Sequence, residues 1–382
     1  MTTTTEYEPY VPAPKSAATL RIRARLAAED AARGTSALAV RETSAMTSQR
    51  EPGLICEPEE VNGAELLGHL AGYFGTYIMF PAVGAHVATT LWNTAALARN
   101  RDDSGLGPPI WRALPLLSPT SKDNKSGKST VLDLTRHVQQ VQRPVKITGR
   151  ALAHKLGRKH EAVVLDEVKL LFGAGGAARD VQGVLLASYT PGGTWSYSRG
   201  NADVDIPCFG PVAYAAKDEL ITATGEQLID LFDRTIFIRM RRPSRLMPQP
   251  DERAEDDGKL LGQSLIEWTN SVRDRLKARS RELADLDYEA SQAAVEDQRG
   301  IDARRPQIWR PLLAVADVAG GPWPALARQA MSELTAGAAT LEAPARMGEI
   351  RTRAQRWAPV PFLATGAVQA GDEDEFDEED ES

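Results

Sequence analysis

The sequence predicts an α/β fold with a largely parallel sheet, and three observations support this prediction. First, short apolar runs alternate with stretches of helical periodicity between residues 101 and 245. Second, AVVLDE (162–167) and TIFIRM (235–240) are mostly apolar, as strands covered on both faces are. Third, the chain has 382 residues, of which 42% are hydrophobic, so it can bury a sizeable core.

Changes in composition divide the chain into five segments. Residues 1–57 are rich in Thr, Ser and Pro and are expected to be mostly disordered. Residues 58–100 are expected to form a helical lead-in, and residues 101–245 the α/β core. A helical C-terminal subdomain is expected over 246–345, followed by a disordered linker and acidic tail at 346–382.

The individual elements follow from periodicity and from Pro and Gly positions. Apolar residues at helical spacing predict one lead-in helix that ends or kinks at Pro81, and AHVATTLWNTAAL (85–97) predicts a second. The predicted strands are RALPLLS (112–118), PVKIT (144–148), AVVLDE (162–167), IPCFGPVAYAA (206–216) and TIFIRM (235–240). Core helices are predicted over 149–160 and 179–189, and a charged linker over 247–259 precedes helices at 260–286 and 307–336.

A candidate phosphate-binding loop lies between the first core strand and a helix. Gly127, Lys128, Ser129 and Thr130 form a Gly-Lys-Ser-Thr sequence, with Ser126 just before it. The start of a helix offers free backbone N–H groups and a positive dipole end, which favour phosphate. In a Walker A loop, the Lys contacts the β- and γ-phosphates and the next hydroxyl binds Mg²⁺, so Lys128 and Ser129 are assigned these roles.

The loop departs from the full Walker A pattern at one position. The pattern requires Gly five residues before Gly127, where this chain has Lys122. Counted from Ser118, the loop also looks long. The alternative is a polar turn followed by a helix that Ser126 or Ser129 caps.

A candidate metal ligand follows the strand AVVLDE. In a Walker B strand, the first acid binds Mg²⁺ and the second orients or deprotonates the attacking water, which assigns these roles to Asp166 and Glu167. Two adjacent acids that end a buried strand are costly unless metal or water solvates them. The alternative is a strand that simply ends at the surface.

Arginines gather around the last predicted strand, in LFDRTIFIRMRRPSR (231–245). In ring-forming ATPases an Arg at such a position enters the neighbouring subunit's site, and Arg234 is the candidate here. Arg239, Arg241 and Arg242 either line a solvated strand edge or contact nucleic acid. Lys217, just after the apolar run that ends at residue 216, is the candidate sensor of the γ-phosphate.

Several function classes are excluded by composition. Two cysteines, Cys56 and Cys208, give neither a disulfide framework nor a zinc site. No apolar stretch is long enough to span a membrane, and the N-terminus lacks the pattern of a secretory signal. A cytoplasmic protein with no membrane partner is therefore expected.

The acidic net charge belongs to the tail. The chain carries −7, but residues 371–382 hold nine acids and no base. Removing these nine from the 52 acids leaves 43 against 45 bases, so the body is nearly neutral. The tail either competes with DNA for the arginines at 234–245, recruits basic replication proteins, or only keeps the protein soluble.

Several of these stretches resemble one family of P-loop ATPases from phages, plasmids and actinobacterial mobile elements. The family is catalogued as a domain of unknown function and often follows a primase module. The similar stretches are YFGTYIMFPAVGAHVATTLWNTAAL (73–97), SPTSKDNKSGKSTVLDL (118–134), VKITGRALAHKLGRKHEAVVLDE (145–167), LFDRTIFIRMRR (231–242) and WRPLLAVADVAGGPWPALARQAM (309–331). The last is the most specific. The phosphate loop is expected to be longer than the family's. The chain also differs from the family in RRPQIW (304–309), which replaces the family's Arg-Ala-Ala-Asp before the Trp.

The resemblance implies a P-loop NTPase core of the AAA+ or helicase-like kind that uses ATP and Mg²⁺. It implies an ATP hydrolase that acts as a helicase-like motor or helicase loader in replication of a phage or mobile element. Single-stranded DNA and a cyclic homo-oligomer are the partners that such a function requires. Two alternatives stay open: an ATP-dependent switch or scaffold with little turnover, and an interaction protein whose nucleotide site has decayed.

Overall fold

The computed structural model describes residues 62–98, 109–144, 147–166, 175–199, 202–218, 228–296 and 304–338. The segments expected to be disordered, 1–57 and 346–382, lie outside these residues. The helices are α2 (Gly63–Tyr77), α3 (Val83–Leu97), α4 (Lys128–Gln139), α5 (Gly149–Gly157), α6 (Gly176–Ala187), α8 (Ile229–Phe232), α9 (Glu252–Ser271), α10 (Arg273–Glu296), α11 (Arg304–Ala319) and α12 (Trp323–Ala338). The strands are β1 (Leu116–Ser121), β2 (Val163–Leu165), β3 (Thr194–Arg199), β4 (Ala202–Pro207), β5 (Val212–Tyr214), β6 (Ala216–Lys217) and β7 (Thr235–Arg239).

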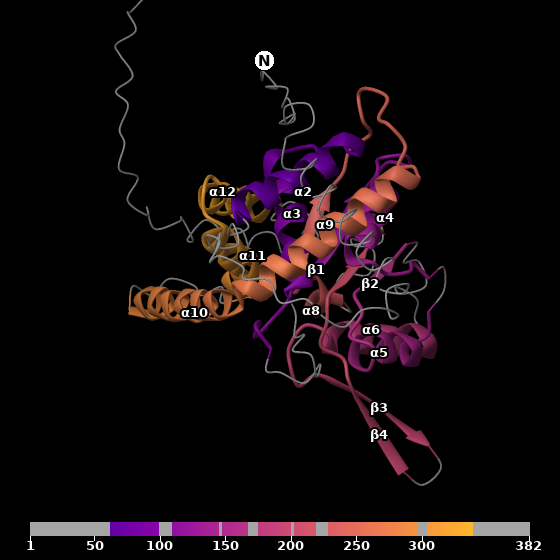
Figure 1. The fold of residues 1–382 in the computed structure, drawn as a ribbon. Coiled ribbons are helices and arrows are strands. Elements are labelled where there is room, and N and C mark those ends of the chain that lie inside the picture. The colour runs from indigo at the N-terminus through magenta and orange to yellow at the C-terminus, as the bar shows by residue number, and fades with distance from the viewer. Residues whose placement is uncertain are drawn as a thin grey trace, which may run out of the picture.

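A parallel sheet forms the centre of the molecule, as predicted (Figure 1). Its path is β2-β5-β1-β6, with β7 also paired to β1. Leu117 pairs with Ala213 and Thr120 with Ala216, the same offset, so β5 and β6 act as two parts of one strand. β7 occupies the other side of β1. The strand β1 therefore lies in the middle, with parallel neighbours on both sides.

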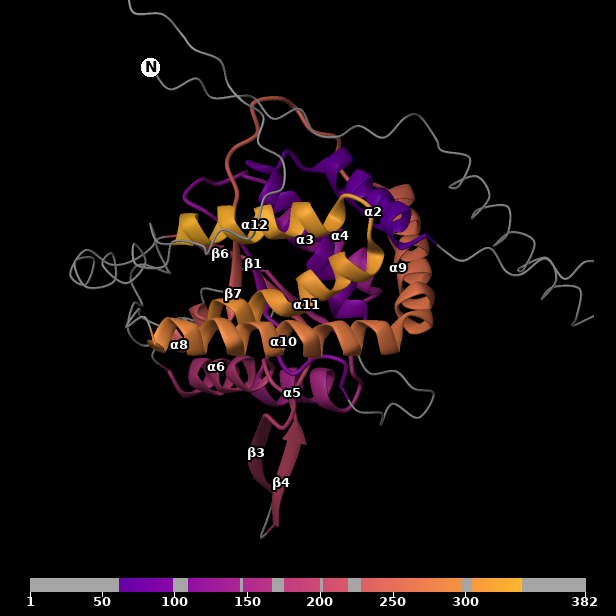
Figure 2. The same ribbon diagram turned by 90° about the vertical axis from the view of Figure 1, so that its left-hand side faces the viewer.

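Each strand sends alternate side chains to two different hydrophobic clusters. Leu117, Val164, Ala213, Ile236 and Ile238 belong to the larger cluster, which α2, α3, α4, α9, α11 and α12 complete. Leu116, Val163, Leu165, Val212 and Tyr214 belong to the second cluster, with α5 and α6. Since successive side chains of a strand point to opposite faces, helices cover both faces of the sheet. Figures 1 and 2 show α5 and α6 apart from α2 and α3.

The larger cluster crosses the segment boundaries that composition suggested. Trp92 of α3, Leu132 of α4, Leu265 of α9 and Leu312 of α11 are all fully buried within it. The helical lead-in, the sheet and the C-terminal helices therefore share one core. At these boundaries the composition changes, but the packing is continuous.

Strands β3 and β4 form a separate antiparallel hairpin that projects from the body (Figure 2). Trp195 and Tyr197 lie on one face, and Arg150 of α5 stacks over the Tyr197 ring at 4.5 Å. On the other face, the hydroxyl of Ser198 donates to the carboxylate of Asp203, its cross-strand partner. The residues TWSYSR form β3.

Five predicted elements differ from the structure. The described residues of 144–148 are not strand, because Thr148 caps α5 by accepting from the Ala151 N–H. The run 206–216 is not one strand but the end of β4, a turn, β5 and the start of β6. The prediction of a charged linker over 247–259 is wrong beyond residue 251, because α9 begins at Glu252. The helices expected over 260–286 and 307–336 are each two helices, which meet at Val272 and at Gly320–Gly321.

The helix α9 begins inside the expected linker because its first residues carry a strong start signal. The Asp251 carboxylate accepts from the Ala254 N–H, and Glu252 and Glu255 place negative charge in the first turn. Ala254 is fully buried, so this turn has an apolar face toward the core as well as its charged face. The many acids of 247–259 are therefore capping and surface residues of a helix.

Two glycines one turn apart let α9 lie against α4. A Cβ on Gly258 would come within 2.6 Å of the Cβ of His137 and of the Tyr73 hydroxyl. A Cβ on Gly262 would overlap the backbone carbonyl oxygen of Val138. A backbone atom cannot move aside as a side chain can, so Gly262 fixes the closest approach of the two helices.

We predict that Gly262→Ala lowers the free energy of unfolding by about 1–3 kcal/mol, because α9 must move away from α4. Ala favours helix by up to about 1 kcal/mol over Gly, so an unobstructed site would show the opposite sign. Gly183→Ala on α6 is the matched control, since nothing lies within 4 Å of its added Cβ. Urea unfolding of both variants measures the difference, and equal stabilities would contradict the close contact.

Candidate functional site

The candidate site residues lie where the parallel strands end. Lys217 of β6 pairs with Ser121, the last residue of β1, and Arg239 of β7 pairs with Thr120. Asp166 directly follows β2. Because parallel strands end at the same edge, the three elements bring these residues to the carboxyl edge of the sheet, where open α/β sheets bind ligands. The loop after β1 emerges at the same edge.

The loop between β1 and α4 is short. It comprises residues 122–127, since β1 continues to Ser121 and α4 begins at Lys128. The expectation of a longer loop is wrong because Ser118 and Thr120 are fully buried strand residues, each paired with β7. The sequence Ser-Pro-Thr-Ser looks like a turn, yet neighbouring strands on both sides of β1 hold it extended.

The backbone of this loop alternates in handedness. Lys125 has φ 59° and Gly127 has φ 88°, whereas Ser126 between them has no positive φ and Lys128 is helical. Alternating conformations of this kind turn successive N–H groups toward one point and create an anion-binding concavity. At Gly127 a Cβ would meet only Met240 Cε, at an ordinary 3.6 Å, so conformation rather than space demands the glycine.

The side chain of Lys128 folds back over the loop. Its Nζ donates to the Asp123 carbonyl oxygen at 3.0 Å and to Ser126 Oγ at 3.1 Å. Burial lowers the pKa of Lys128, and the nearby charge of Lys217 lowers it further. Asp218, Asp166 and Asp123 act in the opposite direction. The ammonium of Lys128 therefore shares one electrostatic neighbourhood with Lys217 and Asp166.

The first turn of α4 has no side-chain cap. Its N-cap residue is Gly127, which has no side chain to accept from the helix N–H groups, so the alternative of a Ser126 or Ser129 cap is not seen. Ser126 is instead buried beneath Lys128. Ser129 is exposed and Thr130 is half-buried on the first turn. The backbone N–H groups there are available to an anion.

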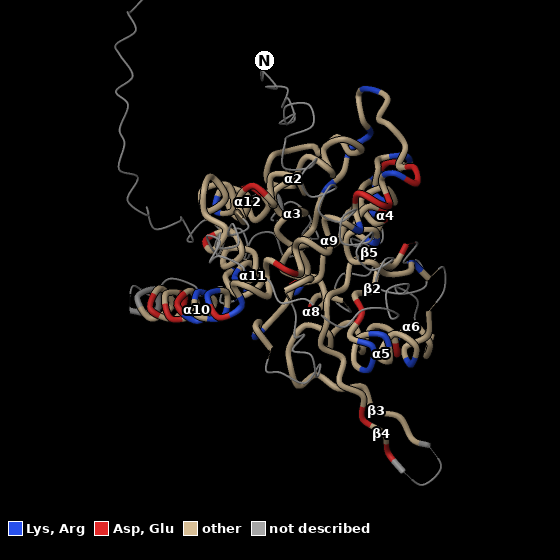
Figure 3. The backbone as a smooth tube through the Cα atoms, viewed as in Figure 1, with Lys and Arg blue, Asp and Glu red and all other residues tan. Residues whose placement is uncertain are grey.

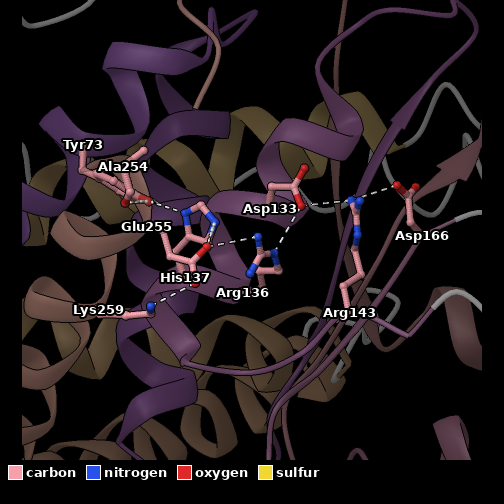
Figure 4. Close-up of polar contacts among 9 residues, drawn as sticks. All are labelled: Tyr73, Asp133, Arg136, His137, Arg143, Asp166, Ala254, Glu255 and Lys259. Carbon is pink, nitrogen blue, oxygen red and sulfur yellow. Dashed lines mark hydrogen bonds and ion pairs between the residues drawn. The ribbon is translucent and has the colours of Figure 1, made fainter. Parts of the chain in front are cut away.

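Asp166 is held by an arginine that the sequence did not point to. Arg143 Nη1 lies 3.0 Å from Asp166 Oδ2 and 3.3 Å from Asp133 Oδ1 on α4 (Figure 4). All three side chains are partly buried. Glu167, the candidate for activating water, lies outside the described residues.

Arg234 lies at the opposite end of the sheet from these residues. Its carbonyl oxygen accepts from the Leu116 N–H at the start of β1, and Arg239 at the carboxyl edge is five residues further along. At about 3.3 Å per residue, this separates the two arginines by roughly 16 Å. The Arg234 guanidinium donates to the Leu186 carbonyl oxygen at 2.8 Å and lies over the Tyr189 ring. The structure thus does not bring Arg234 to Lys128 of the same chain.

The other arginines of this region divide by exposure. Arg239 is half-buried at the carboxyl edge, where burial lowers its pKa and the charge of Asp218 raises it. Arg241, Arg242 and Arg245 are exposed on the loop that joins β7 to α9, which Figure 3 shows with blue segments.

Sequence reasoning missed Arg143, Asp133 and Asp218. Asp218 had a usable signal, since it directly follows Lys217 at the end of a predicted strand. Arg143 had none, because it lies in an irregular segment 23 residues before its partner Asp166. Only the path of the chain around α4 brings these two residues together.

Among the described residues, no three His, Cys, Asp or Glu side chains gather as a metal site. A Mg²⁺ ion keeps several waters and often takes only one or two protein ligands, together with substrate phosphates. Ser129 and Asp166 are the residues here that fit such a partial set. No helix in the described part of the chain is long and apolar enough to span a membrane.

The comparison with known families finds a match in the C-terminal part of the chain. The model of a family described as a protein of unknown function (DUF3631) matches residues 250–353. This region contains α9 to α12 and the stretch WRPLLAVADVAGGPWPALARQAM. The match is consistent with the expected domain of unknown function and covers about a quarter of the chain. No curated protein matches the sequence.

We predict that Gly127→Ala lowers the free energy of unfolding by about 1–2 kcal/mol, because an L-residue with φ near 88° is strained. Gly127→Asn should cost less, since Asn tolerates the left-handed region best among residues with a side chain. Chemical denaturation of both variants measures the two costs. Ala and Asn variants as stable as the natural protein would show that the loop does not adopt this conformation.

Proposed function

We propose that the protein is an Mg²⁺-dependent ATPase of the ring-forming kind, acting as a helicase-like motor or helicase loader in DNA replication of a phage or mobile element. The observation that carries the ATPase proposal is the position of Lys128, Lys217 and Asp166 around one short loop of alternating handedness. Lys217 ends β6 and Asp166 directly follows β2 at one edge of the sheet, where Lys128 begins α4. The replication role rests on the sequence resemblance.

In this proposal the loop 122–127 and the first turn of α4 bind the triphosphate. The N–H groups of the loop surround the phosphates, and the positive end of α4 favours their charge. Lys128 contacts the β- and γ-phosphates once its Nζ leaves the Asp123 carbonyl and Ser126. Ser126 and Thr130 flank these contacts, and Lys217 senses the γ-phosphate from the neighbouring strand.

The residues present fit a Mg²⁺ ion. Ser129 is exposed on the first turn of α4, and Asp166 is only partly buried at the same edge of the sheet. A hydroxyl, a carboxylate, phosphate oxygens and water are the hard oxygen ligands that Mg²⁺ takes. When bound, the ion neutralises charge that develops on the phosphate oxygens. Ser129 and Asp166 orient it, and Glu167 next to Asp166 accepts a proton from the attacking water.

The proposed role of Arg234 requires a second copy of the chain. Arg234 lies about 16 Å along the sheet from the carboxyl edge, so it does not serve the site of its own chain. A guanidinium supplied by a neighbour stabilises transition-state charge in ATPases and GTPases. A closed ring places every copy beside such a neighbour.

A second candidate, an ATP-dependent switch or scaffold with little turnover, is favoured by two observations. The carboxylate of Asp166 is already neutralised by Arg143 at 3.0 Å, which opposes metal binding there. Lys122 in place of the first Walker A glycine points in the same direction. Such a protein binds ATP and changes its partner contacts without hydrolysing it rapidly or translocating on DNA.

We predict that Lys128→Ala abolishes ATP-dependent stabilisation and lowers ATP turnover by at least about a hundredfold, because the phosphates lose their cationic partner. Thermal unfolding with and without Mg²⁺-ATP and a phosphate-release assay measure the two effects. Lys155→Ala is the control, because this lysine lies on α5 and pairs with Glu161. Unchanged turnover in Lys128→Ala and in Glu167→Gln would overturn the ATPase proposal.

The same assays separate the two candidate functions. A motor should hydrolyse ATP faster when single-stranded DNA is added, whereas a switch should bind ATP with slow turnover that DNA does not change.

We predict that Arg234→Ala protein and Lys128→Ala protein are each inactive alone but regain activity when mixed. In a random ring, about a quarter of the interfaces then join an intact phosphate loop to an intact neighbouring Arg234. ATP turnover of the mixture, with oligomeric state measured by light scattering, tests this. Since Arg234 also bonds to Leu186, thermal stability of the variant must be measured. A stable variant that gains nothing from mixing would contradict a role across subunits.

A further inference from the structure

A chain of charged contacts runs from Asp166 across α4 to α9 (Figure 4). Arg143 bridges Asp166 and Asp133, and Asp133 also lies 3.4 Å from Arg136 Nε. Arg136 in turn lies 3.5 Å from Glu255 on α9. These contacts connect the candidate metal ligand to a helix within the region that the family model matches.

At Arg143 two carboxylates share one guanidinium nitrogen. The same Nη1 lies 3.0 Å from Asp166 Oδ2 and 3.3 Å from Asp133 Oδ1. The three side chains are only 23% to 32% exposed, so water screens the pairs less than at the surface. A change in charge at Asp166 therefore alters the relative strength of the ion pairs that Arg143 makes with Asp166 and with Asp133.

We propose that Arg143 is the counter-ion of Asp166 in the absence of a divalent cation, and that metal binding moves it onto Asp133. This rests on the proposed function, which makes Asp166 a metal ligand. A divalent cation and a guanidinium repel each other and use the same carboxylate oxygens, so they compete for Asp166. Asp133 already lies 3.3 Å from Arg143 Nη1, so the displaced guanidinium keeps a carboxylate partner.

The displaced guanidinium changes the charge balance around Arg136, the α4 residue that contacts Glu255 of α9. Asp133 then accepts fully from Arg143 and holds Arg136 less firmly, while Arg136 keeps its contact with Glu255. Glu255 also pairs with Lys259 at 2.9 Å, and this second ion pair restrains its side chain on α9. Gly258 and Gly262 bring this part of α9 directly against α4. Arg143 is thus a positioning residue: through Asp133 and Arg136, metal binding at Asp166 alters the ion pairs that lead to α9.

Two substitutions test the proposal because they should act in opposite directions. Arg143→Gln removes the competing cation and should tighten Mn²⁺ binding about threefold to tenfold, measured with Mn²⁺ and ADP by electron paramagnetic resonance. Asp133→Asn leaves Arg143 with Asp166 alone and should weaken Mn²⁺ binding by about threefold. An ion pair with only a structural role would lower stability in both variants and leave the affinity unchanged.

Further variants keep the result interpretable. Arg310→Gln removes a comparable Arg–Asp pair, with Asp287 in the C-terminal helices, and should leave Mn²⁺ affinity unchanged. Arg143→Lys retains the charge and should bind Mn²⁺ like the natural protein; it serves as the folded comparison if Arg143→Gln is unstable, with Asp133→Asn then carrying the test. Asp166→Asn should weaken Mn²⁺ binding at least tenfold, on the order expected for a lost metal ligand.

The outcomes distinguish the two proposals. If Asp166→Asn does not change Mn²⁺ affinity, Asp166 is not a metal ligand and the proposed function fails at that residue. If Asp166→Asn weakens binding but Arg143→Gln does not tighten it, or Asp133→Asn does not weaken it, Arg143 does not compete with the metal. Only the inference is then overturned.

Discussion

The structure depends on the central position of β1, which has parallel partners on both sides. Because β6 and β7 pair with β1 up to Ser121 and Thr120, the ends of three neighbouring strands are fixed at one edge. The register of the sheet thereby positions Lys217, Arg239 and the loop before α4. Hydrophobic clusters on both faces hold this register, since a slip by one residue would exchange side chains between the larger cluster and the second.

A second consequence of this arrangement is that the C-terminal helices are part of the core. The helix α4 starts at the candidate site and packs along its length against α9. Tyr73 of α2 joins them, because its hydroxyl contacts His137 of α4 and donates to the Ala254 carbonyl of α9. The three helices meet in a polar contact inside an apolar cluster, where such hydrogen bonds favour one packing arrangement. A displacement of α4 therefore alters its contacts with α2 and α9.

The sequence alone predicted the parallel sheet and most of the residues at its carboxyl edge. Apolar runs such as AVVLDE reveal strands because burial on both faces excludes polar residues. Sequence reasoning failed where tertiary contacts override local composition. Residues 118–121 were counted as part of a long phosphate loop but lie in β1, and residues 252–259 were expected to be a linker but begin α9. The role of Arg143 could not be predicted, because its contact with Asp166, 23 residues away, leaves no periodic pattern in the sequence. Glu167 and the tails stay predictions, since they lie outside the described residues.

The projecting hairpin of β3 and β4 has an implication for how the protein behaves at high concentration. A ribbon of only two strands has two open edges, and open edges invite pairing with the same ribbon of another molecule. Asp203 and Asp205 lie on the outward face of β4, seen as red in Figure 3, and bind Ser198 and Ser196 across the ribbon. Negative charges repeated at every second residue repel an identical strand. The hairpin can therefore extend into solvent, with Trp195 and Tyr197 on its other face, while resisting self-association.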